Sequence, residues 1–425
     1  MDTGDTAWIL ASSALVMLMT PGLAFFYGGM VRAKSVLNMM MMSFLAMAII
    51  PVLWVLYGYS MAFDDDIKGG LLGGFGKVGL QGVTQDSLVG TLPEYVFIGF
   101  QVMFAIITVA LISGAIADRA KFFGWAVFVV VWVSIVYFPV AHWVFAFDGD
   151  DTLGGWIANN LGALDFAGGT AVHINAGAAG LALALVLGKR VGWKRDPMRP
   201  HNLPLVLLGA GLLWFGWYGF NAGSAVGANG LAGLAFVNTT VATAAAVLGW
   251  LIVEVIRDQK GTSLGAASGA VAGLVAITPA CAAISPLGSI FLGLGAGALC
   301  AFAVGLKYKL GIDDSLDVVG IHLVAGIAGT LLIGLLATKG NAGVEGLLYG
   351  GNAGLLGKQA VAAGAVLAYS FVLTYIIGKL IDMTIGFRVS EEDEVIGIDL
   401  AEHLETGYDF TSTSGGARSL TGTKI

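Results

Sequence analysis

The 425-residue sequence is poor in charged residues and in cysteine. Asp, Glu, Lys and Arg make up 12% of the chain, 57% of the residues are hydrophobic, and the mean hydropathy is +0.85. Soluble globular proteins do not reach these values, so the composition predicts a polytopic membrane protein. The two cysteines, Cys281 and Cys300, both lie in apolar segments. This excludes a disulfide framework and a thiolate metal cluster.

Basic residues are also few, and the formal net charge is −7. Because no basic patch is available to neutralise phosphates, nucleic acid is excluded as a partner. Glycine, in contrast, is abundant, with 64 residues that recur inside the apolar runs. In a membrane, such glycines let helix backbones approach each other closely.

Eleven segments are long and apolar enough to form spanning helices, each of which needs about 20 mainly apolar residues. They are 8–27, 36–63, 95–117, 122–147, 170–188, 203–223, 231–256, 264–283, 287–306, 318–337 and 359–385. The first segment lacks a basic preceding region and a small-residue cleavage site, so we expect a retained helix rather than a cleaved signal. The sequence therefore predicts an all-α protein with eleven transmembrane helices.

The distribution of Lys and Arg predicts the orientation of these helices, because cytoplasmic loops are enriched in both. Seventeen of the 21 basic residues fall in alternate loops or at the C-terminal end: Arg32, Lys34, Arg119, Lys121, Lys189, Arg190, Lys194, Arg195, Arg199, Arg257, Lys260, Lys307, Lys309, Lys379, Arg388, Arg418 and Lys424. The other four are Lys68, Lys77, Lys339 and Lys358. We therefore expect an outer N-terminus and a cytoplasmic C-terminus. The outer loops carry several Asp and Glu residues, which either concentrate cations or are ordinary solvated loop residues.

Two histidines lie inside apolar segments and share the motif H-x-x-A-G-x-A-G. They are His173, in the fifth predicted span, and His322, in the tenth. An ionisable residue within a membrane is costly and indicates a functional site. An offset of five spans predicts two inverted repeats, about 8–188 and 203–338, with both histidines near the midplane. The eleventh helix, 359–385, has no repeat partner. The alternative is a pair of core histidines bonded to carbonyl groups.

The other histidines, His142, His201 and His403, are expected to be solvated.

Aromatic residues form stripes at helical spacing. Phe100 and Phe104 share one face of the third span, and Trp217, Phe220 and Ser224 form a stripe in the sixth. Aromatic faces together with a hydroxyl group can bind a small cation. The alternative for each stripe is lipid contact or core packing.

Asp165 lies eight residues before His173 and is placed to cap the helix that leads to this histidine. Its charge could also stabilise a nearby cation. Asp313, Asp314 and Asp317 precede His322. We interpret them as cytoplasmic loop and cap residues, without a role symmetric to that of Asp165.

Four motifs resemble those of the ammonium transporter family, the Amt/Mep/Rh group. They are PGLAFFYGG at 21–29, DFAGGTAVHIN at 165–175, GWYGFNAGS at 216–224 and TPAC at 278–281. The resemblance covers the chain up to about residue 409. It implies an eleven-helix homotrimer in the cell membrane, with a pore through each subunit and no cofactor or metal. The implied site residues are the pore histidines His173 and His322, the gate Phe100 and Phe104, the recruitment residue Ser224, the structural aspartate Asp165, and the pore-lining Trp217, Phe220 and Thr278.

One stretch departs from the family pattern. The outer-vestibule tryptophan of the family aligns with Phe145, and an acidic insertion at 148–151 follows. Either Phe145 or Trp156 would then form the outer aromatic wall.

The implied activity is transport of ammonium, which would be recruited outside, lose its proton, and cross as ammonia while the two histidines relay the proton. Burial of the ammonium charge would cost on the order of tens of kcal/mol in a low-dielectric medium, whereas ammonia is neutral. A transmembrane domain would span 1–386, followed by a cytoplasmic regulatory tail at 387–425 whose last part is disordered. By the resemblance, this tail would meet a PII-type signalling protein.

Two other functions compete with transport. One is an ammonium sensor, but the tail of about forty residues is too short for a signalling domain. The other is a membrane redox subunit with His173 and His322 as haem ligands. Haem ligation across a bilayer usually needs several histidine pairs, and a Soret band in the purified protein would favour this function.

The Phe145→Trp variant tests the outer wall. Because tryptophan has a stronger π face for cations, its half-saturating ammonium concentration is expected to fall roughly two- to fivefold. Ammonium-dose curves of transport measure this value. An unchanged or higher half-saturating concentration would contradict the assignment of Phe145.

Overall fold

The computed structural model describes residues 1–149 and 152–408, and almost all of its regular structure is helical. The α-helices are α1 (Thr3–Met30), α2 (Val36–Leu53), α3 (Tyr59–Phe63), α4 (Glu94–Ile112), α5 (Phe122–Trp132), α6 (Phe138–Phe145), α7 (Asn175–Leu187), α8 (Leu203–Gly223), α9 (Gly230–Asp258), α10 (Ser263–Ile277), α11 (Pro286–Leu310), α12 (Val324–Leu336), α13 (Lys339–Ala342), α14 (Ala353–Thr384), α15 (Glu391–Ile396) and α16 (Ile398–His403). Strands β1 (Leu88–Val89) and β2 (Leu92–Pro93) form one small antiparallel hairpin.

Ten helical stretches of the described chain are long and apolar enough to cross a membrane. They agree with ten of the eleven predicted segments within a few residues at most ends. The exception is the predicted span 264–283, in which α10 has only 15 residues and ends at Ile277. Pro279 follows closely, and because proline has no backbone N–H and its ring clashes with the preceding turn, the chain turns here instead of continuing as a helix.

Four of the long helices contain a wider π-helical turn. Trp54–Gly58 joins α2 to α3, and Val133–Tyr137 joins α5 to α6. Gly169–Ile174 leads into α7, and Val319–Leu323 leads into α12. Single π-helical turns within α-helices are frequent at functional sites. The last two of these turns carry His173 and His322.

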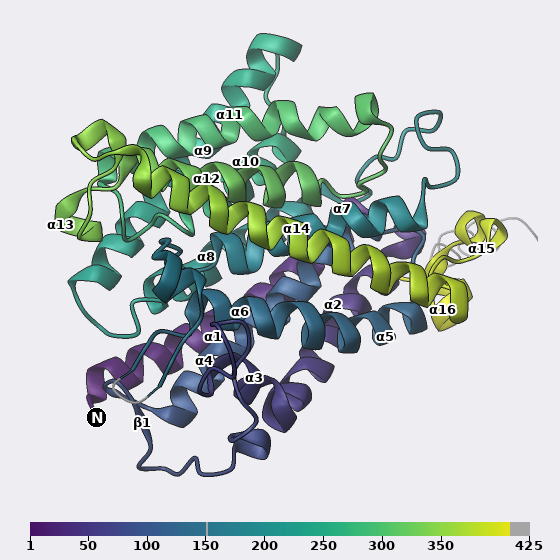
Figure 1. The fold of residues 1–425 in the computed structure, drawn as a ribbon. Helices are drawn as coiled ribbons and strands as arrows, with labels where there is room; N and C mark the ends of the chain where they lie inside the picture. Colours follow the sequence, from purple (N-terminus) through teal and green to yellow (C-terminus); the bar gives the residue numbers. More distant parts are fainter. Residues whose placement is uncertain (150–151, 409–425) are drawn as a thin grey trace, which may run out of the picture.

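The helices form one bundle with residues 387–408 at one end, which we call the tail end, and the N-terminus at the opposite end (Figure 1). Helix α1 packs along α8, and α9 packs against both α10 and α11. Helix α14 runs diagonally across the outside of the bundle and packs against α7 and α12 (Figure 1). The π-helical turn before α7 contacts α12, and the turn before α12 contacts α7.

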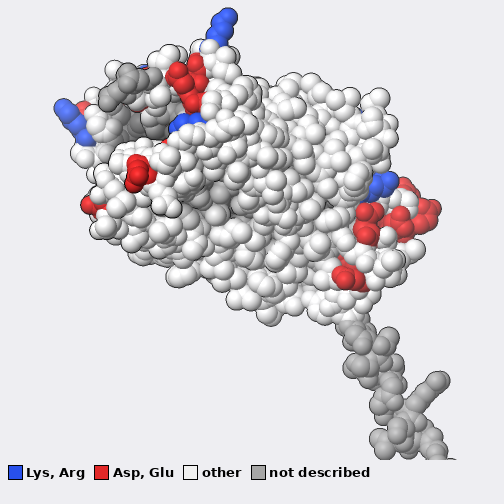
Figure 2. Space-filling view, turned by 90° about the horizontal axis from the view of Figure 1, so that it is seen from below, with Lys and Arg blue, Asp and Glu red and all other residues white. Residues whose placement is uncertain are grey.

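The surface of the bundle is strongly segregated by charge. In the view of Figure 2, charged side chains gather at the two ends, and the broad band between them carries almost none. Large apolar side chains such as Leu248, Phe291 and Phe302 are more than half exposed within long helices. Because such exposure is unfavourable in water, the band fits a lipid environment, and the chain is a multi-pass membrane protein.

Residues 387–408 pack against the helix starts at the tail end. Asp399 accepts hydrogen bonds from the backbone N–H groups of Leu37 and Asn38 in the first turn of α2, at 3.0 and 2.8 Å. Glu402 accepts the N–H of Phe122, the first residue of α5, at 2.9 Å. Two carboxylates from the tail therefore satisfy amide groups that the helices cannot satisfy themselves.

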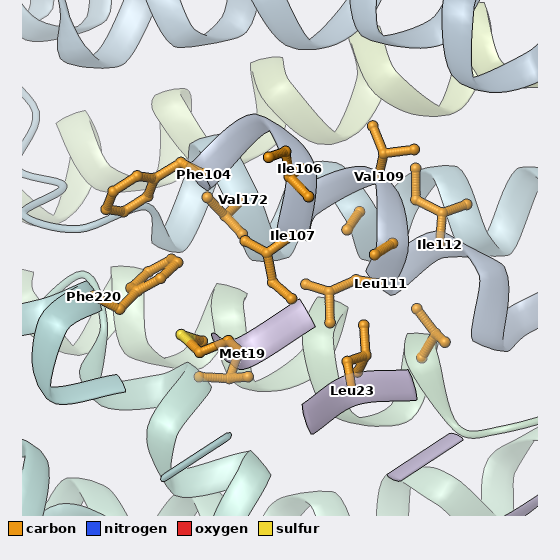
Figure 3. Packing of buried hydrophobic residues seen from close by; sticks show 14 of the residues in the cluster. Met19, Leu23, Phe104, Ile106, Ile107, Val109, Leu111, Ile112, Val172 and Phe220 are labelled. Carbon is orange, nitrogen blue, oxygen red and sulfur yellow. The ribbon is translucent and has the colours of Figure 1, made fainter. Parts of the chain in front are cut away.

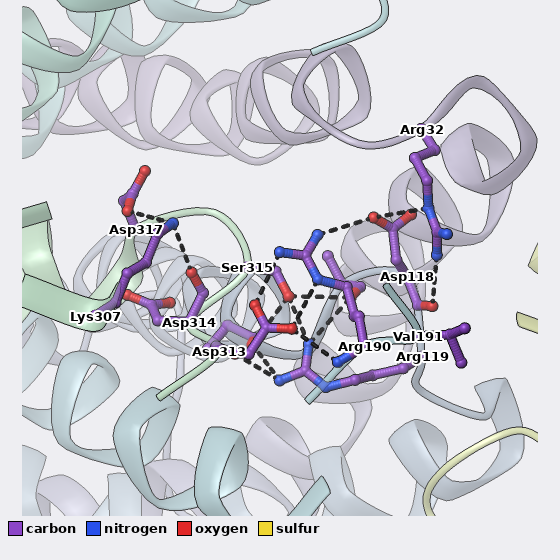
Figure 4. Close-up of polar contacts among 12 residues, drawn as sticks. Arg32, Asp118, Arg119, Arg190, Val191, Lys307, Asp313, Asp314, Ser315 and Asp317 are labelled. Carbon is purple, nitrogen blue, oxygen red and sulfur yellow. Dashed lines mark hydrogen bonds and ion pairs between the residues drawn. The ribbon is translucent and has the colours of Figure 1, made fainter. Parts of the chain in front are cut away.

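A second polar network joins loops from both halves of the chain at this end (Figure 4). The guanidinium of Arg190 contacts Asp313 at 2.8 Å and Asp118 at 3.1 Å. Although burial opposes its charge, the hydrogen bonds and charges of Asp313 and Asp118 raise the pKa of Arg190. Arg119 is fully buried, which lowers its pKa to about 10, and it donates to the carbonyl oxygen of Asp313 at 2.7 Å. The network ties the loop before α12 to the loop after α7.

The expectation that His142 is solvated was wrong. Its side chain is fully buried, with Nδ1 3.0 Å from the carbonyl oxygen of Ala62 and Nε2 3.2 Å from Asp66. The loop after α3 folds back over the end of α6, and this return of a distant loop leaves no local signal in the sequence. His201 and His403 are partly buried, each with a hydrogen-bonding partner.

Glycine allows α9 and α11 to pack with their backbones in close contact. A Cβ atom on Gly293 or Gly297 would lie 2.1 Å from the carbonyl oxygen of Ala242 or Ala246, respectively. Gly295, on the same helix, would place its Cβ atom in open space. The glycine-rich composition therefore serves close helix packing here, as the sequence predicts.

The Gly297→Ala variant is expected to lose roughly 1–3 kcal/mol of stability, because its methyl group would force α9 and α11 apart. Thermal unfolding in detergent measures the loss as a lower melting temperature. The matched control is Gly295→Ala, which should melt at or slightly above the wild-type temperature. Equal melting temperatures for the two variants would contradict close packing at Gly297.

Candidate functional site

The side chains of His173 and His322 lie together in the interior of the bundle. Their Nδ1 atoms are 3.4 Å apart, their ring centroids are 5.5 Å apart, and the rings are 1% and 3% exposed. A hydrogen bond between two Nδ1 atoms needs one donor and one acceptor, so the two rings must hold their protons differently. Among the described residues, none accepts from or donates to Nε2 of His173. The pair therefore differs from two core histidines that are each bonded to a carbonyl group.

Asp165 caps the segment that leads to His173. Its two carboxylate oxygens accept the backbone N–H groups of Gly168, Gly169 and Thr170, at 2.6 to 2.9 Å, and of Ala171 at 3.3 Å. The hydroxyl group of Thr170 also donates to it. Five donors occupy the acceptor positions of this carboxylate. Asp165 therefore fixes the start of the helical segment that carries His173.

Asp314 makes a corresponding cap, which corrects the expectation that no residue before His322 has a role symmetric to that of Asp165. Its carboxylate accepts the N–H groups of Val318 and Val319 at 3.0 and 2.8 Å. Like Asp165, Asp314 lies eight residues before the histidine. The equal spacing was available in the sequence, but three nearby aspartates obscured it. Burial raises the pKa of Asp314 to about 6.

Aromatic rings lead away from His173 toward the end of the bundle opposite the tail. The ring of His173 stacks on Trp217, with centroids 5.4 Å apart, and lies 6.0 Å from Phe220. Phe220 in turn lies 4.4 Å from Phe104, measured between ring centroids, and the two rings lie next to each other in Figure 3. The indole N–H of Trp217 donates to the hydroxyl oxygen of Thr278 at 2.8 Å. The rings therefore form a continuous apolar series above the histidine pair.

A cavity of about 650 Å³, which we call the vestibule, opens at the end opposite the tail. A hollow is visible at that end in Figure 2. Its lining includes Phe104, Phe145 and Ser224. The hydroxyl group of Ser224 donates to the carbonyl oxygen of Phe220 at 2.8 Å, so its lone pairs remain able to accept a hydrogen bond from a cation.

The described lining of the vestibule does not include the other two aromatic candidates, Phe100 and Trp156. Phe100 is 1% exposed and packs edge to face against Phe104, with centroids 4.9 Å apart. Trp156 packs on Trp143, with centroids 5.8 Å apart. Of the two alternatives for the outer wall, Phe145 lines the vestibule, whereas Trp156 packs on Trp143.

The vestibule also contains residues beyond the aromatic and serine candidates. Tyr59 and Gln101 line it, as do the charged side chains of Asp64, Lys77 and Asp148. Most of these residues come from the loops after α3 and α6, whose return over the bundle cannot be read from helical periodicity. The available signals were the acidic residues of the outer loops, which the sequence analysis noted, and Lys77, one of two basic residues in the loop after α3.

The fold and the site together define a multi-pass membrane transport protein, in which a vestibule leads through aromatic rings to a buried histidine pair. The sequence model of the Ammonium Transporter Family matches residues 7–408 of this chain. An ammonium transporter of Mycobacterium tuberculosis is 62% identical over 97% of this chain and 92% of its own length. The chain belongs to the ammonium transporter family.

Solved structures agree with this assignment. The crystal structure of Saccharomyces cerevisiae Mep2 superposes with a TM-score of 0.84 at 35% identity, over 92% of this chain and 88% of that one. A structure described as a sensor Amt protein has a TM-score of 0.86 at 28% identity, over 94% and 98% of the two chains. The predicted family and the predicted all-α, multi-pass fold are confirmed.

The Asp314→Ala variant tests the second cap. Loss of the carboxylate leaves the N–H groups of Val318 and Val319 without their acceptor, which is expected to cost about 1–2 kcal/mol. Thermal unfolding in detergent would show a lower melting temperature. The control is Asp317→Ala, because Asp317 pairs with Lys307 at 2.7 Å but is 22% exposed. If Asp317→Ala destabilises the protein as much as Asp314→Ala, the cap is not the main role of Asp314.

Proposed function

We propose that this protein moves ammonium across the cell membrane by separating it into ammonia and a proton along the path from the vestibule to the histidine pair. The observation that carries the proposal is the unbroken series from Ser224 and Phe145 in the vestibule, through Phe104 and Phe220, to His173. Every residue of this series faces either the cavity or the next ring. Such an arrangement suits a small cation at its entrance and a neutral molecule farther inside.

The vestibule is the recruitment site in this proposal. The ring of Phe145 provides a π face, and the lone pairs of Ser224 accept an N–H group of the cation. The nearby carboxylates of Asp64 and Asp148 raise the local concentration of cations. Below the vestibule, Phe104 with Phe100 behind it forms the gate. No charge can pass through such an apolar constriction at low cost, so the proton must leave the ammonium here.

Asp165 contributes by its charge and by holding the helix start. Its acceptor positions are filled by the backbone of residues 168–171, so it stabilises positive charge near the gate without itself binding the substrate. Below the gate, Trp217, Phe220 and Thr278 line the path of ammonia. His173 and His322 carry the proton, because an imidazole both donates and accepts.

Selectivity follows from this chemistry. Potassium has no proton to release, and the path offers aromatic rings and imidazoles rather than a ring of carbonyl groups that could replace its hydration shell. A passing ammonia molecule, in contrast, can accept a hydrogen bond from an imidazole N–H and donate to its second nitrogen.

The membrane topology completes the proposal. We count eleven spans, in which α10 together with its following turns is the eighth, with an outer N-terminus and a cytoplasmic tail. The mutual contacts of α7, α12 and their preceding π-helical turns support two inverted repeats, and α14 is the unpaired eleventh helix. The subunits form a homotrimer.

The described tail, residues 387–408, is the proposed docking region for a PII-type regulator. The tail contacts α2 and α5 through Asp399 and Glu402, so a regulator bound there could act on both helices. The disordered segment predicted at the end of the tail lies outside the described residues.

Currents from proteoliposomes on a solid-supported membrane test the proposal. An ammonium pulse is expected to give a transient current, whereas a potassium pulse of equal concentration gives none. In the His173→Ala and His322→Ala variants, loss of the proton relay should reduce the ammonium current about tenfold or more, or admit potassium.

A matched control is His201→Gln, because His201 lies at the tail end and contacts Val31 and Tyr408 instead of the path. It should keep the wild-type current. Wild-type currents and full potassium exclusion in both histidine variants would exclude the relay.

A further inference from the structure

The lining of the vestibule includes a positively charged side chain, that of Lys77. Lys77 is the one basic residue in the described part of its lining, which also contains the carboxylates of Asp64 and Asp148. It is also one of only four basic residues that the charge distribution assigns to the outer side of the membrane. A fixed positive charge in the entrance for a cation opposes binding of the substrate, so its presence needs an explanation.

The ammonium group of Lys77 lies in a site with the chemistry of a cation-binding site. Its Nζ atom is 2.5 Å from Oε1 of Glu94 and 5.6 Å from the centroid of the Tyr59 ring. The hydroxyl group of Tyr59 donates to the same carboxylate oxygen at 2.8 Å. A carboxylate and an aromatic face are the two groups that best stabilise a primary ammonium ion.

The backbone on both sides of this contact is anchored, while the lysine side chain is partly exposed to the cavity. The N–H of Lys77 donates to Ser60 at 3.0 Å, and the N–H of Glu94 donates to the carbonyl oxygen of Ser87 at 2.8 Å. The side chain of Glu94 is 8% exposed, whereas that of Lys77 is 33% exposed. The carboxylate is therefore buried beside the vestibule, whose lining includes Tyr59 and Lys77, and the amine approaches it from the cavity on a flexible four-carbon chain.

Glu94 also lies in line with the gate. Phe97, Gln101 and Phe104 all line the vestibule, and they follow Glu94 on α4 at intervals of three, four and three residues. Residues at this spacing share one face of a helix. The carboxylate thus stands about 15 Å along this face from Phe104, given a rise of 1.5 Å per residue.

We propose that Glu94 and Tyr59 form a second cation site in the vestibule, and that Lys77 occupies it as a tethered competitor of the substrate. The site takes ammonium and short primary alkylammonium ions, which share the –NH₃⁺ or NH₄⁺ chemistry of the lysine head. An incoming cation displaces the amine of Lys77 from Glu94 before it moves along α4 to Phe104. This inference rests on the proposed function, because it assumes that the substrate enters through the vestibule.

Three variants test the competition. Lys77→Met keeps the apolar stem but vacates the site, so the half-saturating ammonium concentration should fall about threefold. Glu94→Gln leaves the charge of Lys77 unpaired in the cavity, so the concentration should rise about threefold. The double variant Lys77→Met/Glu94→Gln should return close to the wild-type value. Currents from proteoliposomes at several ammonium concentrations measure all three.

Two controls separate this role from a purely structural ion pair. Lys77→Arg keeps the charge and should keep the wild-type half-saturating ammonium concentration. Lys68→Met removes an exposed charge of the same loop that lies outside the vestibule lining. A structural pair would make both single variants less stable and move their half-saturating concentrations in the same direction, or not at all. Either result would overturn the proposal.

A binding measurement keeps the inference testable if no current is found in any variant. Methylammonium chloride, compared with sodium chloride at equal ionic strength, should raise the melting temperature of Lys77→Met more than that of the double variant. Absence of this difference would refute the site itself. A difference without any transport current would instead leave the site standing and refute transport.

Discussion

The structure depends on how the N–H groups at the start of two interrupted helices are satisfied in an apolar interior. A helix that begins within a bundle exposes amide groups to surroundings without water, where each unpaired group is costly. Asp165 and Asp314 accept these groups before α7 and α12. The two π-helical turns that follow bring His173 and His322 together. The carboxylates are thus structural groups first, and the position of the histidine pair is a consequence of the caps.

The rest of the path is built on rigid, closely packed helices. The aromatic rings of the path come from α4, α6 and α8, and α8 is held along α1 over its whole length. Glycines at the helix contacts remove the side chains that would keep the backbones apart. Because closely packed helices resist displacement, the positions of these rings are set by the helix packing.

The sequence predicted the helices well because each span carries its own signal, a long apolar run. It also predicted the histidine pair, since a repeated motif at a fixed offset reveals symmetry without any structure. It predicted α10 too long, because a hydrophobic run hides the break at Pro279. The burial of His142 and the presence of Tyr59 and Lys77 in the vestibule were missed, because long loops return over the bundle without a local pattern. The capping role of Asp314, which corresponds to that of Asp165, was missed, although both aspartates lie eight residues before a histidine.

The network at the tail end has a consequence for biogenesis. Arg190 finds its partner Asp313 123 residues later in the chain, and Arg119 reaches the carbonyl oxygen of the same residue 194 residues later. While the ribosome is still synthesising α8 to α11, the guanidinium groups of the first half have yet to meet these partners. Before that, Arg190 has Asp118 of the first half as a partner, and its ion pair with Asp313 forms after the second half is inserted. Assembly of the two halves is completed only after the loop before α12 has left the ribosome.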